Sequence, residues 1–546
     1  MGISGMVYSA EYCSPLVGVC VTIRHVDGST VHTTHSGPSG EWTVPKMTDD
    51  HVVEYDKDGY VPKTYVGSGA PGKVRLLEDR LIGYQRKLWF APGEAVEAFV
   101  HSPCSYAGTL YRHGYRKEAV LEAGEFSSQR QVVPDGEFVD CGLDWTRSFQ
   151  YRIPENAVPG IYSMSLQATG QESFAIPMIV STTPGKYGER TRLLVLASTN
   201  NWLTYNTWGG RSRYRNYEDG SQRDFPGGAY DGESNLGARL KEIARRRVPA
   251  RVKAILRSLW PAPPPPSWFF KRLSVRRPFT NCGLEAEDVT RPFTNHLAAG
   301  EWRLLAWLER ENYGYDIISG YELHNDPSLL RHYRAVILNT HSEYWSRAMY
   351  EGLRAFHVEN RGWVLNISGN SLFREVEYFE DGSLRCASLS FAESCADETK
   401  ILGVRFTLDG YGTCAPYAVR EPEHWAFEGI STCRGTTFGG LSLNQNTRRS
   451  ATRYDAGRPG VDKGLEGCGA SGWETDKLSR TAPSDIVVIA KGMNRRGGAD
   501  MVIREPDGPR GGMFSASSIV FSGCLLIDDV ASTLVQNVLR RALSGK

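Results

Sequence analysis

The stretch that decides the fold of this chain is Ala335-Val336-Ile337-Leu338-Asn339-Thr340-His341-Ser342-Glu343-Tyr344-Trp345-Ser346. An apolar run typical of a buried strand leads straight into a polar turn, and a helical pattern follows from 348 to 356. Open α/β sheets carry their chemistry in such turns. His341, Glu343 and Tyr344 offer a general base, a carboxylate and a phenolate ligand. A well-capped strand-to-helix loop without chemistry has the same pattern, and both interpretations stay open.

Strand and helix patterns alternate over the second half of the chain. The run Arg192-Leu193-Leu194-Val195-Leu196-Ala197 is apolar throughout after its first residue, residues 302–310 have helical periodicity, and residues 362–367 form another strand pattern. This order predicts an α/β doubly wound domain with a parallel sheet, of the flavodoxin or glutamine-amidotransferase type, over residues 185–546.

Two segments of short alternating strands precede this domain, which makes three predicted domains in 546 residues. Residues 1–78 combine strands with Gly-containing turns, and residues 81–184 contain a second such series, so each predicts a β-sandwich. The first segment resembles the carboxypeptidase-regulatory, transthyretin-like sandwich in Gly40-Glu41-Trp42-Thr43-Val44-Pro45 and in Gly59-Tyr60. That resemblance implies a non-catalytic appendage.

The composition excludes several classes of protein. Lys and Arg number 63 against 62 Asp and Glu, so nothing indicates a nucleic-acid partner. No apolar run reaches about 18 residues, and the first residues lack a signal-peptide pattern, so we expect no transmembrane segment and a cytoplasmic location. The eleven scattered cysteines contain no Cys-x-x-Cys pair. Reduced thiols are the simpler interpretation, and a Cys-rich metal site between Cys386 and Cys468 is the alternative.

A basic stretch interrupts the α/β pattern between Arg239 and Arg277. It holds twelve Lys or Arg and one acid, Glu242, and includes a proline run at 261–266. We expect an exposed insertion that is dispensable for folding. A basic amphipathic helix for an anionic surface is the alternative.

Three polar turns follow three of the predicted strands. The first holds Asn201, Trp202, Tyr205 and Asn206, the second is the 340–346 turn, and the third holds Asn370. In a doubly wound fold these turns meet in one crevice. An aromatic loop packed on the sheet edge would also explain the first of them. Neither a Gly-x-Ser-x-Gly elbow nor a Gly-rich phosphate-binding motif is present, which argues against serine-hydrolase and nucleotide chemistry.

Taken together, these segments resemble the large (beta) subunit of N,N-dimethylformamidase and its relatives. The similarity covers residues 80–546 in patches that recur in the same order. The main matching pieces are Tyr205-Asn206-Thr207-Trp208-Gly209-Gly210, His341-Ser342-Glu343-Tyr344-Trp345-Ser346, Ser368-Gly369-Asn370, His424-Trp425-Ala426-Phe427-Glu428-Gly429, Gly472-Trp473-Glu474 and Gly512-Met513-Phe514-Ser515-Ala516-Ser517-Ser518-Ile519.

The resemblance implies hydrolysis of a small linear amide at a mononuclear iron, Fe(III), held by two tyrosines and one glutamate. It places Tyr344 on one tyrosine and Glu474 on the glutamate. No motif places the second tyrosine: the segment Asn295-His296-Leu297-Ala298-Ala299-Gly300 has none, and Tyr205 is the substitute. Phenolate and carboxylate oxygens are hard donors that suit Fe(III).

The remaining roles follow from the same resemblance. A metal-bound water would attack the polarised carbonyl, with Glu505 or Glu343 transferring protons and His341 or His424 orienting water or substrate. The substrate-binding candidates are Asn201, Trp202, Asn206 and Asn370. Besides a small amide substrate we expect a small partner subunit or a homo-oligomer. A non-catalytic binding or scaffold protein on a decayed amidase fold, and a hydrolase or transferase of another class, are the alternatives.

Overall fold

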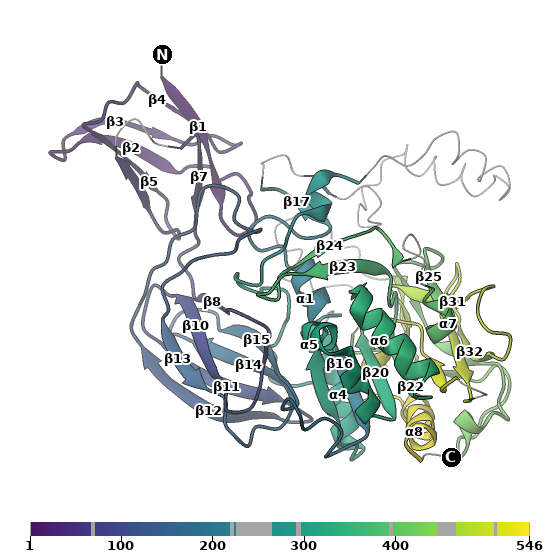
Figure 1. Ribbon diagram of the computed structural model, residues 1–546. Helices are drawn as coiled ribbons and strands as arrows, with labels where there is room; N and C mark the ends of the chain where they lie inside the picture. Colours follow the sequence, from purple (N-terminus) through teal and green to yellow (C-terminus); the bar gives the residue numbers. More distant parts are fainter. Residues whose placement is uncertain are drawn as a thin grey trace, which may run out of the picture.

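The chain folds into several β-sheets, and its helices gather around the largest of them (Figure 1). This computed structural model describes residues 2–66, 71–218, 223–224, 265–290, 296–391, 397–444, 466–506 and 510–544. None of the described helices has the length and apolarity needed to cross a membrane. The ten cysteines within these ranges form no disulfide with one another.

The first strands form two small sheets at one end of the molecule (Figure 1). Their side chains alternate between buried and exposed, and the buried set, with Trp42, Val53 and Tyr55, packs between the sheets. One sheet has the order β4-β1-β7 and the other β3-β2-β5-β6. The strands are β1 (Ile3–Ser9), β2 (Cys20–His25), β3 (Thr30–His35), β4 (Glu41–Val44), β5 (His51–Asp56), β6 (Lys63–Val66) and β7 (Lys73–Leu76).

The next strands form a three-stranded and a five-stranded sheet, as expected for a second sandwich. Every pair is antiparallel except β9 with β15. The orders are β13-β10-β8 and β12-β11-β14-β15-β9. The strands are β8 (Ile82–Gln85), β9 (Trp89–Phe90), β10 (Ala95–His101), β11 (Tyr106–His113), β12 (Lys117–Phe126), β13 (Phe149–Arg152), β14 (Gly160–Gln167) and β15 (Phe174–Val180).

A nine-stranded sheet of order β19-β16-β20-β22-β34-β33-β32-β27-β28 carries the candidate site. Its first five strands are parallel: β19 (Asp316–Ser319), β16 (Leu193–Ala197), β20 (Ala335–Thr340), β22 (Trp363–Ser368) and β34 (Met513–Ser515). The other four are antiparallel: β33 (Asp500–Arg504), β32 (Val487–Gly492), β27 (Tyr417–Val419) and β28 (Thr437–Phe438). The sequence patterns predicted β16, β20 and β22 but missed β34 and the antiparallel half of the sheet, and the doubly wound arrangement stays a prediction.

The helices lie against this sheet (Figure 1). Ser346 caps the helix after the 340–346 turn by accepting from the Met349 amide, and Ser319 forms a capping box with Glu322. The α-helices are α1 (Thr199–Tyr205), α4 (Ala298–Arg310), α5 (Gly320–Asn325), α6 (Arg347–Val358), α7 (Thr399–Leu402) and α8 (Asp529–Ser544). The 3-10 helices are η2 (Ser267–Phe270), η3 (Pro327–His332), η5 (Trp425–Phe427) and η6 (Phe521–Cys524).

Short strands connect these elements. They are β17 (Arg215–Asn216), β18 (Arg223–Asp224), β21 (Tyr344–Trp345), β23 (Arg374–Tyr378), β24 (Leu384–Cys386), β25 (Val404–Thr407), β26 (Thr413–Ala415), β29 (Glu466–Gly467), β30 (Ser471–Gly472) and β31 (Thr475–Leu478).

The end of the basic stretch is packed into the protein. Residues 239–264 lie outside the described ranges. Beyond them, Trp268, Phe269 and Leu273 are buried, and the buried Arg277 guanidinium donates hydrogen bonds to main-chain carbonyls. The expectation that this stretch is dispensable is therefore wrong for residues 265–277.

Candidate active site

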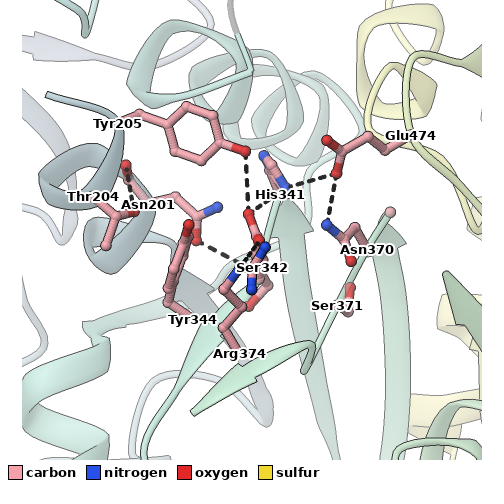
Figure 2. Close-up of polar contacts among 12 residues, drawn as sticks. Asn201, Thr204, Tyr205, His341, Ser342, Tyr344, Asn370, Ser371, Arg374 and Glu474 are labelled. Atoms are coloured by element: carbon pink, nitrogen blue, oxygen red, sulfur yellow. Dashed lines mark hydrogen bonds and ion pairs between the residues drawn. The ribbon is translucent and has the colours of Figure 1, made fainter. Parts of the chain in front are cut away.

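Three polar turns at the ends of parallel strands carry the candidate site (Figure 2). Strand β16 leads into the buried helix α1, β20 into the 340–346 turn, and β22 into residues 369–371. Thr340 and Asn370 have φ values of 49° and 53°, so the chain turns sharply where it leaves the sheet. Non-glycine residues seldom adopt this conformation, and it clusters at functional sites.

Two tyrosines and one glutamate form a compact oxygen cluster, which we define as Tyr205, Tyr214 and Glu343. The Tyr205 hydroxyl lies 3.1 Å from Oε2 of Glu343. The Tyr214 hydroxyl lies 2.9 and 3.1 Å from the two Glu343 oxygens and 3.0 Å from the Tyr205 hydroxyl. Tyr344 adjoins the cluster, with its hydroxyl 2.8 Å from that of Tyr214.

Burial controls the protonation of this cluster. It is the main cause that raises the pKa of Glu343, and Arg374, whose Nε donates to Oε1 at 3.0 Å, opposes it. Burial and then the Glu343 carboxylate raise the pKa of Tyr214 well above 10, and the same two causes act on Tyr344. Without a bound cation the phenols therefore keep their protons and surround the carboxylate.

His341 lies between two carboxylates (Figure 2). Its Nε2 is 3.5 Å from Glu343 and 3.4 Å from Glu474, and the ring is fully buried. Among the described residues neither ring nitrogen has a hydrogen-bond partner. The far carboxylate is held by Asn370, whose Nδ2 donates to Glu474 at 2.8 Å.

Further unpartnered polar atoms surround this imidazole. They are Nδ2 of Asn201, Oδ1 of Asn370 and Nε2 of His296, again counted among the described residues. His296 packs its ring 5.0 Å from that of His341 and 4.8 Å from that of Tyr205. A buried polar group without a partner costs about 1–3 kcal/mol. Several such atoms in one place therefore indicate room for a polar ligand.

The comparison with protein families gives the observation that decides the family. A model described as N,N-dimethylformamidase beta subunit-like, C-terminal, matches residues 107–532. The chain belongs to this dimethylformamidase beta-subunit-like family. The comparison with curated proteins gave no match.

Solved structures show only weak likenesses to this dimethylformamidase-like chain. A ThuA-like protein from Bacteroides uniformis is 11% identical with a TM-score of 0.27, over 46% of this chain and 89% of that one. The α2-macroglobulin of E. coli is 13% identical with a TM-score of 0.12, over 33% and 12%. Both scores are too low to support a statement about fold or function.

In this dimethylformamidase-like chain the oxygen cluster matches the donor set implied by the resemblance. That set is two tyrosines and one glutamate, and Tyr205, Tyr214 and Glu343 have oxygens within 3.1 Å of one another. Tyr344 and Glu474, the ligands expected from the motifs, reach the cluster through Tyr214 and through His341 respectively. The assignment of Tyr344 and Glu474 as metal ligands stays a prediction.

The structure separates the remaining predicted residues into two groups. Asn201 and Asn370 lie at the site, and the Asn201 side-chain oxygen accepts from the Glu343 amide at 3.3 Å. Trp202 and Asn206 are structural, since the indole donates to Glu301 at 2.7 Å and the amide to the Pro278 carbonyl at 2.9 Å.

Two of the predicted catalytic residues lie elsewhere. Glu505 pairs with Arg541 at 2.9 Å on a partly exposed surface, and His424 caps η5 by accepting from the Ala426 amide. None of these contacts involves the oxygen cluster. The motif around His424 follows β27, on the antiparallel side of the sheet.

The loop that carries Tyr214 is anchored by segments distant in sequence. The buried Arg75, in strand β7 of the N-terminal sheets, donates to the carbonyls of Gly209 and Glu218, each at 3.1 Å. The Gly209 amide donates to the Glu11 carbonyl at 2.7 Å. Arg277 donates to several carbonyls of the same loop. The N-terminal segment therefore helps to hold the loop that carries Tyr214, in addition to being the non-catalytic appendage that the resemblance implies.

Sequence reasoning missed Tyr214, Arg374, His296 and Trp473. Tyr214 follows Tyr205 by nine positions, with the Gly209-Gly210 turn between them. This turn was the one feature of the sequence that could have indicated that the chain brings Tyr214 back towards Tyr205. Both glycines have φ near +90°, as a sharp loop reversal requires. Trp473, with φ of 63°, packs edge-on against His296, with the ring centres 4.5 Å apart.

Proposed function

We propose that this chain is an amidohydrolase of small linear amides, N,N-dimethylformamidase-like, that holds one Fe(III) ion at the oxygen cluster. The observation that carries the proposal is the contact of Tyr205, Tyr214 and Glu343 within 3.1 Å, next to the unpartnered atoms of His341. The family match supports the reaction class.

The chemistry of the donor set fits a hard, strongly charged ion. Two phenolates and a carboxylate are oxygen donors, whereas zinc sites are usually built from nitrogen and sulfur. Phenols with pKa values raised by burial lose their protons only to a strong Lewis acid. When bound, such an ion lowers the pKa of a coordinated water and polarises an amide carbonyl.

The chain's own residues supply the proton transfers. Nε2 of His341 can accept a proton from the attacking water and return it to the nitrogen of the departing amine. Glu474 lies 3.4 Å from Nε2 of His341. Its carboxylate stabilises the imidazolium that exists between the two proton transfers. Asn370 fixes Glu474 in this position by its 2.8 Å hydrogen bond.

Two amides are placed to orient the substrate. Nδ2 of Asn201 is an unpartnered donor and suits a carbonyl oxygen, while Oδ1 of Asn370 is an unpartnered acceptor and suits an N–H or a water. Arg374 favours the charged form of the Glu343 carboxylate and orients it, because its Nε donates to Oε1 at 3.0 Å. Fixed polar groups in a buried site stabilise charge that develops during the reaction.

A turnover assay tests the proposal. Iron-loaded chain is incubated with N,N-dimethylformamide, formamide and acetamide, and the released amine or ammonia is measured. We expect turnover of at least one of them, and a loss of kcat by about 10²–10⁴-fold in His341→Asn. His424→Gln is the matched control and keeps its activity. Absence of turnover by the iron-loaded protein would favour the non-catalytic binding alternative.

We also propose a small partner subunit, since the family is named for a beta subunit. The chain purified from its native host should elute from a sizing column with a second, smaller polypeptide. Elution of this chain by itself at the mass of one copy would contradict the proposal.

A further inference from the structure

Two histidines and one aspartate meet at the surface of the N-terminal strands. His25, at the end of β2, is the cross-strand partner of His51, at the start of β5, and Asp50 precedes His51. The two imidazole rings lie 4.8 Å apart. One ligand atom from each of the three residues can be chosen so that all lie within 4.8 Å of one another. Among the described His, Cys, Asp and Glu residues, no other group of three meets this condition.

The spacing of these atoms fits ligands on one small ion. Nδ1 of His25 lies 3.5 Å from Oδ2 of Asp50. Two ligands at about 2.1 Å from a tetrahedral zinc ion are separated by about 3.4 Å. Antiparallel neighbours such as His25 and His51 hold their side chains on the same face of the sheet, so the backbone fixes the pair before any ion binds.

Thr48 orients two of the three ligands. Its hydroxyl hydrogen-bonds Oδ1 of Asp50, and the same oxygen lies 3.2 Å from Nδ1 of His51. The Thr48 main-chain amide donates to Nδ1 of His51 at 3.1 Å, so in the neutral ring Nδ1 carries the lone pair, and an ion bound there would replace the amide as its partner.

We propose that His25, Asp50 and His51 bind one divalent transition-metal ion of the zinc class at the surface of the N-terminal strands. Imidazole nitrogens with one carboxylate suit Zn²⁺. The partial exposure of the His25 and Asp50 side chains, 44% and 65%, gives the ion direct access and leaves room for water as the fourth ligand. The site is separate from the oxygen cluster and does not depend on the proposed amidase activity.

Chemical modification of histidines tests the site directly. The full chain, stripped of metal, is treated with diethyl pyrocarbonate with and without Zn²⁺, and each histidine is quantified by mass spectrometry. We expect Zn²⁺ to protect His25 and His51 at least about tenfold. His35, exposed on the neighbouring strand β3, is the internal control and keeps its reactivity. Equal modification of His25 and His51 in both samples would overturn the proposal.

Calorimetric titration with Zn²⁺ gives the stoichiometry. His51→Gln and Asp50→Asn should each bind about one ion fewer than the wild type, or bind it at least about tenfold more weakly. His35→Gln should titrate like the wild type. Asp50 and His35 are exposed and His51 is half-buried, and circular dichroism checks that each variant is folded. An unchanged titration in His51→Gln would contradict the proposal even if zinc binds elsewhere.

Discussion

The Tyr214 hydroxyl lies 2.9 Å from Oε2 of Glu343, although the two residues are 129 positions apart in the sequence. The contact depends on the 206–218 loop, which Arg75 and Arg277 hold by hydrogen bonds to its carbonyls. The positions of the cluster oxygens therefore depend on the residues that hold this loop. The effect of changing those residues can be measured as protein stability, separately from activity.

Arg75→Met should loosen the 206–218 loop and so displace Tyr214, although Arg75 does not itself belong to the oxygen cluster. The change keeps the aliphatic part of the side chain and removes one of the two donors to each of the Gly209 and Glu218 carbonyls, which keep the Cys13 thiol and the Lys73 ammonium respectively. The cost is about 0.5–1.5 kcal/mol for each hydrogen bond lost. We expect a lower free energy of unfolding in urea and a lower iron content. Arg24→Met is the control, because Arg24 pairs with Glu54 at the surface and an exposed pair contributes about 1 kcal/mol or less. Equal effects of the two changes would refute the anchoring role.

Gly210→Ala should destabilise the loop more than Gly28→Ala. The two glycines have φ values of 91° and 90°, so the backbone strain of an alanine is the same at both positions. At Gly210 the added methyl group also collides with Cys13 Sγ, whereas nothing lies within 4 Å of it at Gly28. Overpacking typically costs a further 1–3 kcal/mol or so. Thermal melts that show equal losses for both variants would mean that the loop does not pack against the N-terminal strands.

Asp476 should make the stability depend on pH. Burial raises its pKa from 3.8 to about 7, while the Asn370 amide and Lys477 act in the opposite direction. The folded state then keeps a proton that the unfolded chain loses, so this contribution is present at low pH and lost as the pH rises through about 7. The melting temperature of Asp476→Asn minus that of the wild type should increase between about pH 4 and about pH 8. A constant difference would show that Asp476 stays ionised.

The local parts of the fold could be predicted from the sequence. The apolar run before Thr340 and the polar turn after it are adjacent in the chain, and each of the other two strand ends is likewise followed directly by its own polar turn. The contact of Tyr214 with Glu343 could not be predicted in this way, because it requires a loop closed by residues from two other parts of the chain. The motif around His424 was misleading for the same reason, since its order in the sequence says nothing about which end of the sheet it reaches.

The ligand assignment shows the same limit. Tyr344 and Glu474 flank the cluster, at 2.8 Å from Tyr214 and 3.4 Å from His341 respectively. Motif order therefore places both expected ligands next to the oxygen cluster. It could not decide between neighbours such as Glu343 and Tyr344, because both side chains reach the same Tyr214 hydroxyl.

The visible absorption spectrum of the iron-loaded protein tests the central claim most directly, because a phenolate bound to Fe(III) gives a charge-transfer band. We predict such a band in the wild type, its loss or strong reduction with a lower iron content in Tyr205→Phe and Tyr214→Phe, and its retention in Tyr344→Phe. A band that survives in Tyr214→Phe and disappears in Tyr344→Phe would contradict the assignment of the oxygen cluster. A wild type that binds iron without any band would contradict tyrosine ligation altogether.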